Sequence, residues 1–296
     1  MNTSNIFGFE ETEKMGLRKG AVFYFNDWID EKIISILEEI VEQFLSLTQE
    51  QFTKKRSGEN DAYVNRRNIR GGWKKVFHRA FDNFDDSNIL ILDNCTPQQL
   101  QTIYTCIKPT NYRGPSHFVY SYLYFQFPLD IEWSTVYLFM EYVNSKLTIR
   151  YASAGYEMAF NDLCPKSSGY GARALNQLKY INSEYTEWDD LRLSTRFGVP
   201  CPNFIQILCP ELTQKMASEI LDELHGKLVN TNLFLDILDR KSEKMPEPAL
   251  EQIKSRYQKL YWLLKPLLVS PERSMFMKKE DWELELHPVS KESYSL

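Results

Sequence analysis

The chain has 296 residues, 43% of them hydrophobic and 25% charged, which is the usage of a folded globular protein and argues against a disordered one. The formal net charge of −5 at pH 7 disfavours nonspecific binding of nucleic acid, which needs a basic footprint. No uninterrupted apolar run approaches the ~20 residues that a membrane-spanning helix requires.

The chain opens with a polar lead over residues 1–19. This lead lacks the basic region and the apolar region of a secretory signal, so we expect no signal peptide. The five cysteines are odd in number and scattered, which fits a reducing compartment. Both observations favour a cytoplasmic location.

The first regular elements are a strand and an amphipathic helix. Ala21–Phe25 is a compact apolar run, and Asn26-Asp27 is a helix start signal. The helix that follows has Ile33, Leu37, Ile40 and Phe44 at helical spacing, which predicts a buried face.

Residues 50–72 are polar and predict a loop. Its cations are Lys54, Lys55, Arg56, Arg66, Arg67 and Arg70. They are either a patch that binds anions or nucleic acid, or ordinary solvated charges. The acidity of the whole chain favours the second interpretation.

The middle of the chain alternates between helices and strands. A helix is predicted from Thr96-Pro97 to Lys108-Pro109, and a second one over Glu132–Lys146. Phe118–Phe127 alternates as a strand, with Tyr120, Tyr122 and Tyr124 on one face and Leu123, Phe125 and Phe127 on the other. Leu147–Tyr151 predicts another strand.

The C-terminal part contains an acidic, aromatic loop at residues 182–190, a strand running into a helix at 196–216, a strand at Leu233–Leu238 and a long helix reaching Leu264. We predict an α+β fold with a mainly antiparallel sheet packed with long amphipathic helices. It forms a single large domain over residues 20–269, followed by a polar tail over 270–296. The expected buried side chains are Phe23, Phe25, Leu123, Phe125, Ile205, Ile207, Leu235 and Ile237 in strands, and Ile33, Leu37, Val136, Phe139, Leu260 and Leu264 in helices.

Residues that could carry catalysis do not form a recognisable motif. The four histidines, His78, His117, His225 and His287, show no metal-binding spacing. Cys201 and Cys209 are also spaced unlike zinc ligands. Gly169–Arg173 could cradle a phosphate, but it lacks the Lys-Ser/Thr end of a phosphate-binding loop. We therefore expect no enzyme activity, no metal and no cofactor.

Four segments carry a resemblance to a known family. They are residues 21–47, with their Phe-Tyr strand and long helix; 151–160, a run of small residues; 196–216, RFGVPCPNFIQILCPELTQKM; and 255–267, the final helix. In this order they resemble the type VI secretion immunity proteins, the family that includes antidotes of VRR-Nuc-type effectors, over roughly residues 17–268. The chain departs from the family pattern at Phe204, where a Trp is usual, and at His225-Gly226, where a Gly pair is usual.

The resemblance implies an immunity protein that binds and neutralises a cognate effector, a nuclease of the VRR-Nuc type. It implies no direct contact with nucleic acid or membrane. An acidic, aromatic surface could occlude a basic nucleic-acid cleft. The candidate partner-binding residues are Glu184, Tyr185, Glu187, Trp188, Asp189 and Asp190, with Trp282 and Glu283 in the tail; a further acidic set is Asp82, Asp85 and Asp86. Two alternatives stay open: a hydrolase of a phosphate ligand near Gly169–Arg173, and a structural or adaptor component of a secretion apparatus.

Overall fold

The computed structural model describes residues 15–59, 66–85, 88–96, 99–112, 120–160, 204–214, 224 and 226–237, with six further positions between 256 and 267. The C-terminal tail lies outside the described residues. β1 begins at Met15, so its first residues belong to the segment that we expected to be a polar lead.

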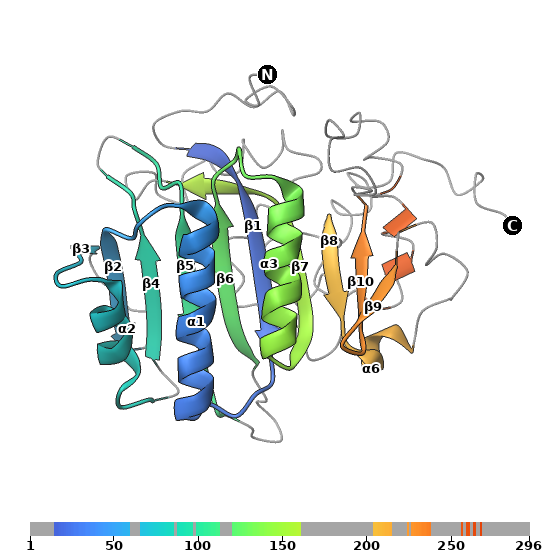
Figure 1. Ribbon diagram of the computed structural model, residues 1–296, viewed down its shortest axis with the longest axis horizontal. Coiled ribbons are helices and arrows are strands. Elements are labelled where there is room, and N and C mark those ends of the chain that lie inside the picture. The colour runs from blue at the N-terminus through green and yellow to red at the C-terminus, as the bar shows by residue number, and fades with distance from the viewer. Residues whose placement is uncertain are drawn as a thin grey trace, which may run out of the picture.

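One antiparallel sheet dominates the described residues. Its strands are β1 (Met15–Phe25), β2 (Lys54–Glu59), β3 (Arg67–Asn68), β4 (Asn88–Asp93), β5 (Tyr104–Lys108), β6 (Ser121–Phe127), β7 (Ile149–Phe160), β8 (Ile205–Leu208), β9 (Lys227–Val229) and β10 (Asn232–Asp236). Their order is β3-β2-β4-β5-β6-β1-β7-β8-β10-β9, and each neighbouring pair is antiparallel (Figure 1). The prediction of a mainly antiparallel sheet is confirmed.

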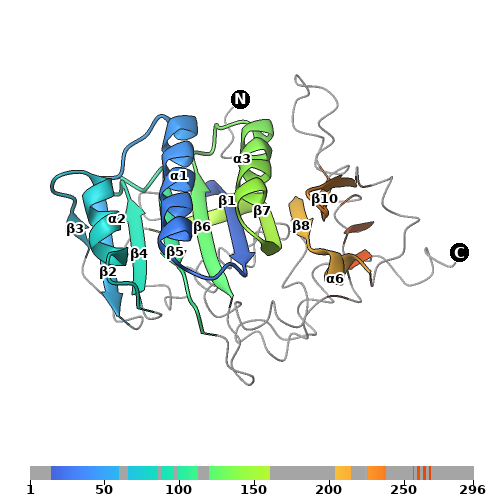
Figure 2. The same cartoon turned by 60° about the horizontal axis from the view of Figure 1, so that its bottom comes forward.

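The described helices are α1 (Glu31–Thr48), α2 (Trp73–Phe81), α3 (Trp133–Lys146) and α6 (Pro210–Thr213). Figures 1 and 2 show α1, α2 and α3 on the same face of the sheet. The α+β class therefore fits. The expectation of long amphipathic helices does not describe the set, because α2 has 9 residues and α6 has 4. No described helix is both long enough and apolar enough to cross a membrane.

α1 begins later than its predicted start signal. Asp30 is the N-cap, and its carboxylate accepts a hydrogen bond from the Ile33 amide at 2.9 Å. Asp27 serves another purpose, since its carboxylate accepts from the Thr148 amide and hydroxyl at 2.7 and 2.9 Å. It thereby joins the end of β1 to the start of β7.

The core between the helices and the sheet is aromatic. Phe44 of α1 lies 4.9 Å from Phe125 and from Phe127, measured between ring centroids, and Phe139 of α3 lies 5.0 Å from Phe125. Such edge-on and tilted contacts add to the free energy gained by burial. All the side chains that we expected to be buried are buried.

The opposite face of the central strands carries tyrosines. Tyr24 stacks on Tyr122 and on Tyr151, each at 6.0 Å between centroids, as the register of β1 with β6 and β7 requires. The three rings are at most 4% exposed. The expected division of β6 into two faces is confirmed, and both faces are buried.

The helix predicted from Thr96 to Lys108 is wrong. Its second half is β5, which is hydrogen-bonded between β4 and β6 and buried throughout. Before it, the Asn94 carboxamide oxygen accepts from the Thr102 and Ile103 amides and so holds the two ends of the connection between β4 and β5 together. Pairing on both edges outweighs the helical spacing of the apolar residues.

The loop predicted over residues 50–72 is also wrong. β2 pairs with β4 from Lys54 to Glu59, and β3 pairs with the start of β2. Polar, Lys-rich strands are typical of the edge of a sheet, where they oppose pairing with other chains. The absence of an apolar pattern was therefore a poor guide at this edge.

Candidate partner-binding surfaces

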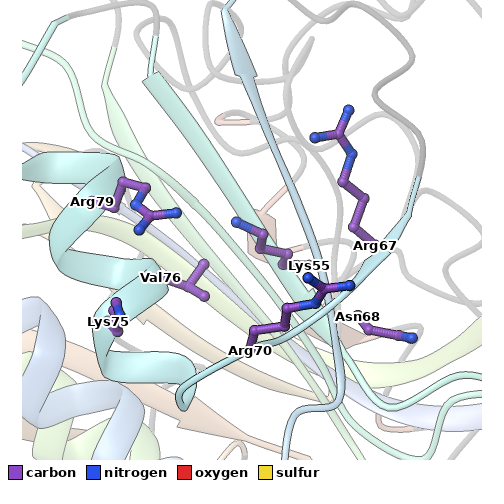
Figure 3. Close-up of a pocket in the computed structure, with 7 residues that line it drawn as sticks. All are labelled: Lys55, Arg67, Asn68, Arg70, Lys75, Val76 and Arg79. Carbon is purple, nitrogen blue, oxygen red and sulfur yellow. The ribbon is translucent and has the colours of Figure 1, made fainter.

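A basic depression lies where the edge of the sheet meets α2. It has a volume of about 380 Å³ and is lined by Lys55, Arg67, Asn68, Arg70, Lys75, Val76 and Arg79. We call it the basic groove. Figure 3 shows Lys55 of β2 and Arg79 of α2 extending toward one another, with Arg70 beside Lys55. Five of the seven lining residues are cations.

A glycine pair sets the position of α2 against β2. Gly71 and Gly72 have φ angles of 79° and 86°, and Gly72 has ψ 158°, a conformation that only glycine adopts readily. The pair turns the chain sharply from β3 into α2. Lys75 and Arg79 are four residues apart and so share the helix face that lines the groove.

Two cations beside the groove, Arg66 and Lys74, are paired with carboxylates, whereas the groove cations have no such partner among the described residues. Arg66 donates to the Asp93 carboxylate at 3.0 Å, and Lys74 pairs with Glu42 and Glu38 of α1. The hydrogen bond from Lys74 to Glu42 is the main cause that raises the Lys74 pKa. Within the described part of the chain, no carboxylate is paired with Lys55, Arg67, Arg70, Lys75 or Arg79. The groove therefore presents uncompensated positive charge.

The sequence indicated the groove cations that lie before α2 but not those on α2. Lys55, Arg67 and Arg70 were in the predicted basic loop, for which we favoured solvated charges. Lys75 and Arg79 were missed because α2 was not predicted. The signals that could have revealed them are the Gly71-Gly72 turn and two cations at helical spacing.

A second surface displays aromatic rings beside acidic residues. Trp28, between β1 and α1, is 63% exposed, and Tyr112 is 46% exposed. The two segments are joined by Asn111, which accepts from the Ile29 amide at 2.7 Å and donates to the Ile29 carbonyl at 2.9 Å. Asp30 and Glu31 are exposed next to Trp28. Exposed Trp and Tyr are the residue types that protein interfaces favour.

The third surface is a polar depression of about 390 Å³, which contains Cys209 at the start of α6. Arg150 Nη1 donates to both Cys209 Sγ and Glu211 Oε2 at 2.8 Å, and the Cys209 thiol donates to the same carboxylate oxygen at 2.8 Å. Burial is the main cause that raises the pKa of Cys209, and the bond from Cys209 is the main cause that lowers the pKa of Glu211. A thiol that stays protonated is a poor nucleophile.

The partner-binding residues predicted from the sequence, Glu184, Tyr185, Glu187, Trp188, Asp189, Asp190, Trp282 and Glu283, lie outside the described residues, as do Asp86 and Gly169–Arg173. Asp82 and Asp85 are exposed just after α2. Among the described residues, no three His, Cys, Asp or Glu side chains are grouped so that they could hold a metal ion.

Comparisons with known proteins identify a shared fold. No protein-family model matches the chain, and no curated protein does. Among solved structures, "Pseudomonas aeruginosa T6SS protein PA0821" matches with a TM-score of 0.63 and 11% identity. The match covers 88% of this chain and 76% of that one.

Proposed function

We propose that the chain is an immunity protein that binds and neutralises a cognate type VI secretion effector in the cytoplasm, without enzyme activity of its own. The observation that carries this proposal is the fold shared with a T6SS protein over 88% of the chain. The resemblance of four segments to type VI immunity proteins agrees with it. Residues 21–47 and 151–160 of that resemblance lie in β1, α1 and β7, so it concerns the framework of the fold.

Inhibition is by occlusion of the effector's active or substrate-binding site, and a nuclease with a basic cleft is the expected target. Exposed Trp28 with neighbouring Asp30 and Glu31 has the required chemistry, because a ring can fill a pocket while carboxylates attract a basic rim. The acidic loop at residues 182–190, with Trp188, is the other candidate for this contact. Both support a protein partner.

The test uses the product of the reading frame adjacent to that of this chain. Coexpression with that product should protect a bacterial host, and the two purified proteins should form a complex with a Kd of order 10⁻⁹ M. The isolated chain should show no turnover of nucleic acids, phosphoesters or peptides. Failure of the wild-type chain both to protect and to bind would refute the proposal, and turnover abolished by Arg173→Ala would favour a hydrolase.

The interface is tested by one single and one double variant in the same assay. Trp188→Ala should mainly speed dissociation, since an anchoring ring acts after encounter, whereas Asp189→Lys with Asp190→Lys should mainly slow association. If both variants bind like wild type and Trp28→Ala dissociates faster, the interface lies at the connection between β1 and α1 and not in the loop at residues 182–190.

A further inference from the structure

The cations of the basic groove form pairs of like charge, and the repulsion within each pair lowers the stability of the fold. Lys55 is the register partner of Arg67, so two cationic residues lie directly opposite each other on β2 and β3. Lys75 and Arg79 repeat this at the i, i+4 spacing of α2. Each like-charge pair destabilises a protein. An anionic ligand would offset both repulsions, whereas no carboxylate in the described part of the chain is paired with any of these four cations.

The limits of the groove define the size of that ligand. The other side of α2 faces the carboxylates of α1, where Lys74 pairs with Glu42 and Glu38. Asp82 and Asp85 are exposed directly after the helix. A long polyanion leaving the groove in these directions would meet negative charge. The site therefore fits a short anionic segment.

The lining also distinguishes between kinds of anion. Single-stranded nucleic acid is held by aromatic rings on which bases stack, and none of the seven lining residues is aromatic. The net charge of −5 opposes the long-range attraction of any polyanion, and it opposes a long one such as nucleic acid more strongly than a short acidic segment. Guanidinium groups such as those of Arg70 and Arg79 bind carboxylates, as they bind phosphates, through two parallel hydrogen bonds, so they can hold an acidic side chain without an aromatic platform.

We propose that the basic groove is a docking site for a short segment rich in Asp and Glu on a protein partner. The identification of that partner as the effector rests on the proposed function. The groove lies at the β3 edge of the sheet, and the partner would contact β2, β3 and α2 there (Figures 1 and 3).

The direct test measures binding of a short, labelled peptide rich in Asp and Glu by fluorescence anisotropy. The variant Lys75→Gln with Arg79→Gln should weaken binding about tenfold or more, because two charge-assisted contacts are lost. The matched control is Lys32→Gln with Lys227→Gln, which removes the same charge from exposed positions elsewhere and should leave binding unchanged. The groove variant should also unfold at the same or a higher temperature than wild type, since a repulsion is removed.

Competing anions decide the class of ligand. Tighter binding of a single-stranded DNA oligonucleotide of equal charge would overturn the proposal, as would equal competition by inorganic phosphate. Equal loss in the groove variant and the control would also overturn it, because the attraction would then be nonspecific.

The same variants measured against the product of the adjacent reading frame separate the two proposals. If wild type binds that protein and the groove variant binds it about tenfold more weakly, both stand. If both bind equally, the inference about the groove fails and the immunity proposal survives. If wild type binds the peptide but not that protein, the proposed function fails and the groove keeps its acidic ligand.

Discussion

At Gly72 the backbone conformation, and not the surrounding space, requires a glycine. Apart from its own residue and the two next to it in the chain, no atom would lie within 4 Å of a Cβ at this position, so space does not exclude a side chain. Its φ of 86° and ψ of 158° exclude a side chain, because only glycine adopts this conformation without strain.

We expect Gly72→Ala to lower the free energy of unfolding by about 1–3 kcal/mol. Denaturant titration measures this, with Gln51→Ala, at an exposed position, as the control that should change it by less than about 0.5 kcal/mol. An unchanged stability would mean that the turn into α2 relaxes freely, and that the groove is not held in place by its glycines.

Cys209 is a residue whose reactivity is set by its neighbours. Burial and the hydrogen bond to Glu211 raise its pKa above the ordinary value of 9.0. The folded state therefore holds this proton more tightly than the unfolded state. The resulting stability is present below the ordinary pKa and is lost as the pH rises through the folded one.

Alkylation of Cys209 should consequently need a higher pH than alkylation of a free thiol. Glu211→Gln should lower the midpoint pH, because it removes the carboxylate, while burial keeps part of the shift. Peptide-level mass spectrometry of iodoacetamide labelling across pH gives both midpoints. Identical midpoints for wild type and Glu211→Gln would show that the carboxylate does not act on the thiol.

At the scale of elements, Phe44 is one of five buried residues that hold α1 on the sheet. This fully buried ring contacts Phe52, Phe125, Phe127 and Phe139. Phe44→Ala should cost about 3–5 kcal/mol of stability, since it leaves a cavity among rings that cannot close around it.

The matched control is Leu138→Ala on α3, whose side chain is 62% exposed. It should change the free energy of unfolding by no more than about 0.5 kcal/mol. Chemical denaturation followed by circular dichroism measures both. A loss below about 1 kcal/mol in Phe44→Ala would contradict the packing of α1 on the sheet.

Elements with a strong local pattern were predictable from the sequence. α3 and the two faces of β6 follow from the spacing of Val136, Phe139, Leu123 and Phe125. β5 was predicted as a helix because Ile103 and Ile107 are four residues apart, whereas its pairing partners in β4 and β6 lie 11 to 22 residues away, beyond the span of one helical pattern. Local spacing contains no information on such pairing.

The basic groove was predictable only as charge, because its shape depends on long-range pairing. Lys55 and Arg67 were recognised as cations, but their opposition follows from the register of β2 with β3. The order of the ten strands in the described sheet likewise could not be predicted from the sequence. The exposure of Trp28 could not be predicted, because an apolar residue beside the start of a helix can be either buried or exposed.

At the scale of the whole molecule, the sheet order predicts a gradient of local stability. β1, β6 and β7 are central and buried, whereas β3 and β9 are the terminal strands of the described sheet. Amide hydrogens should therefore exchange slowest in peptides covering Tyr24 and Tyr124, and fastest in those covering Arg67 and Leu228.

Hydrogen exchange followed by mass spectrometry measures this gradient, with the chain in denaturant as the fully exchanged control. Equal protection of β2 and β6 would contradict it. Protection of β2 and β3 that rises only when the acidic peptide is added would be the result expected of an occupied groove.

The central position of β1 also determines when the protein can fold during synthesis. Phe23 pairs with Leu123 and with Ala152, so β1 has neither of its partner strands until a hundred further residues have been synthesised. At ~5–20 residues per second this delay is about 5–20 s. During it, the run Ala21–Phe25, which ends fully buried, is exposed on a nascent chain. The central strand of the finished sheet is thus a segment that needs protection from aggregation before the sheet exists.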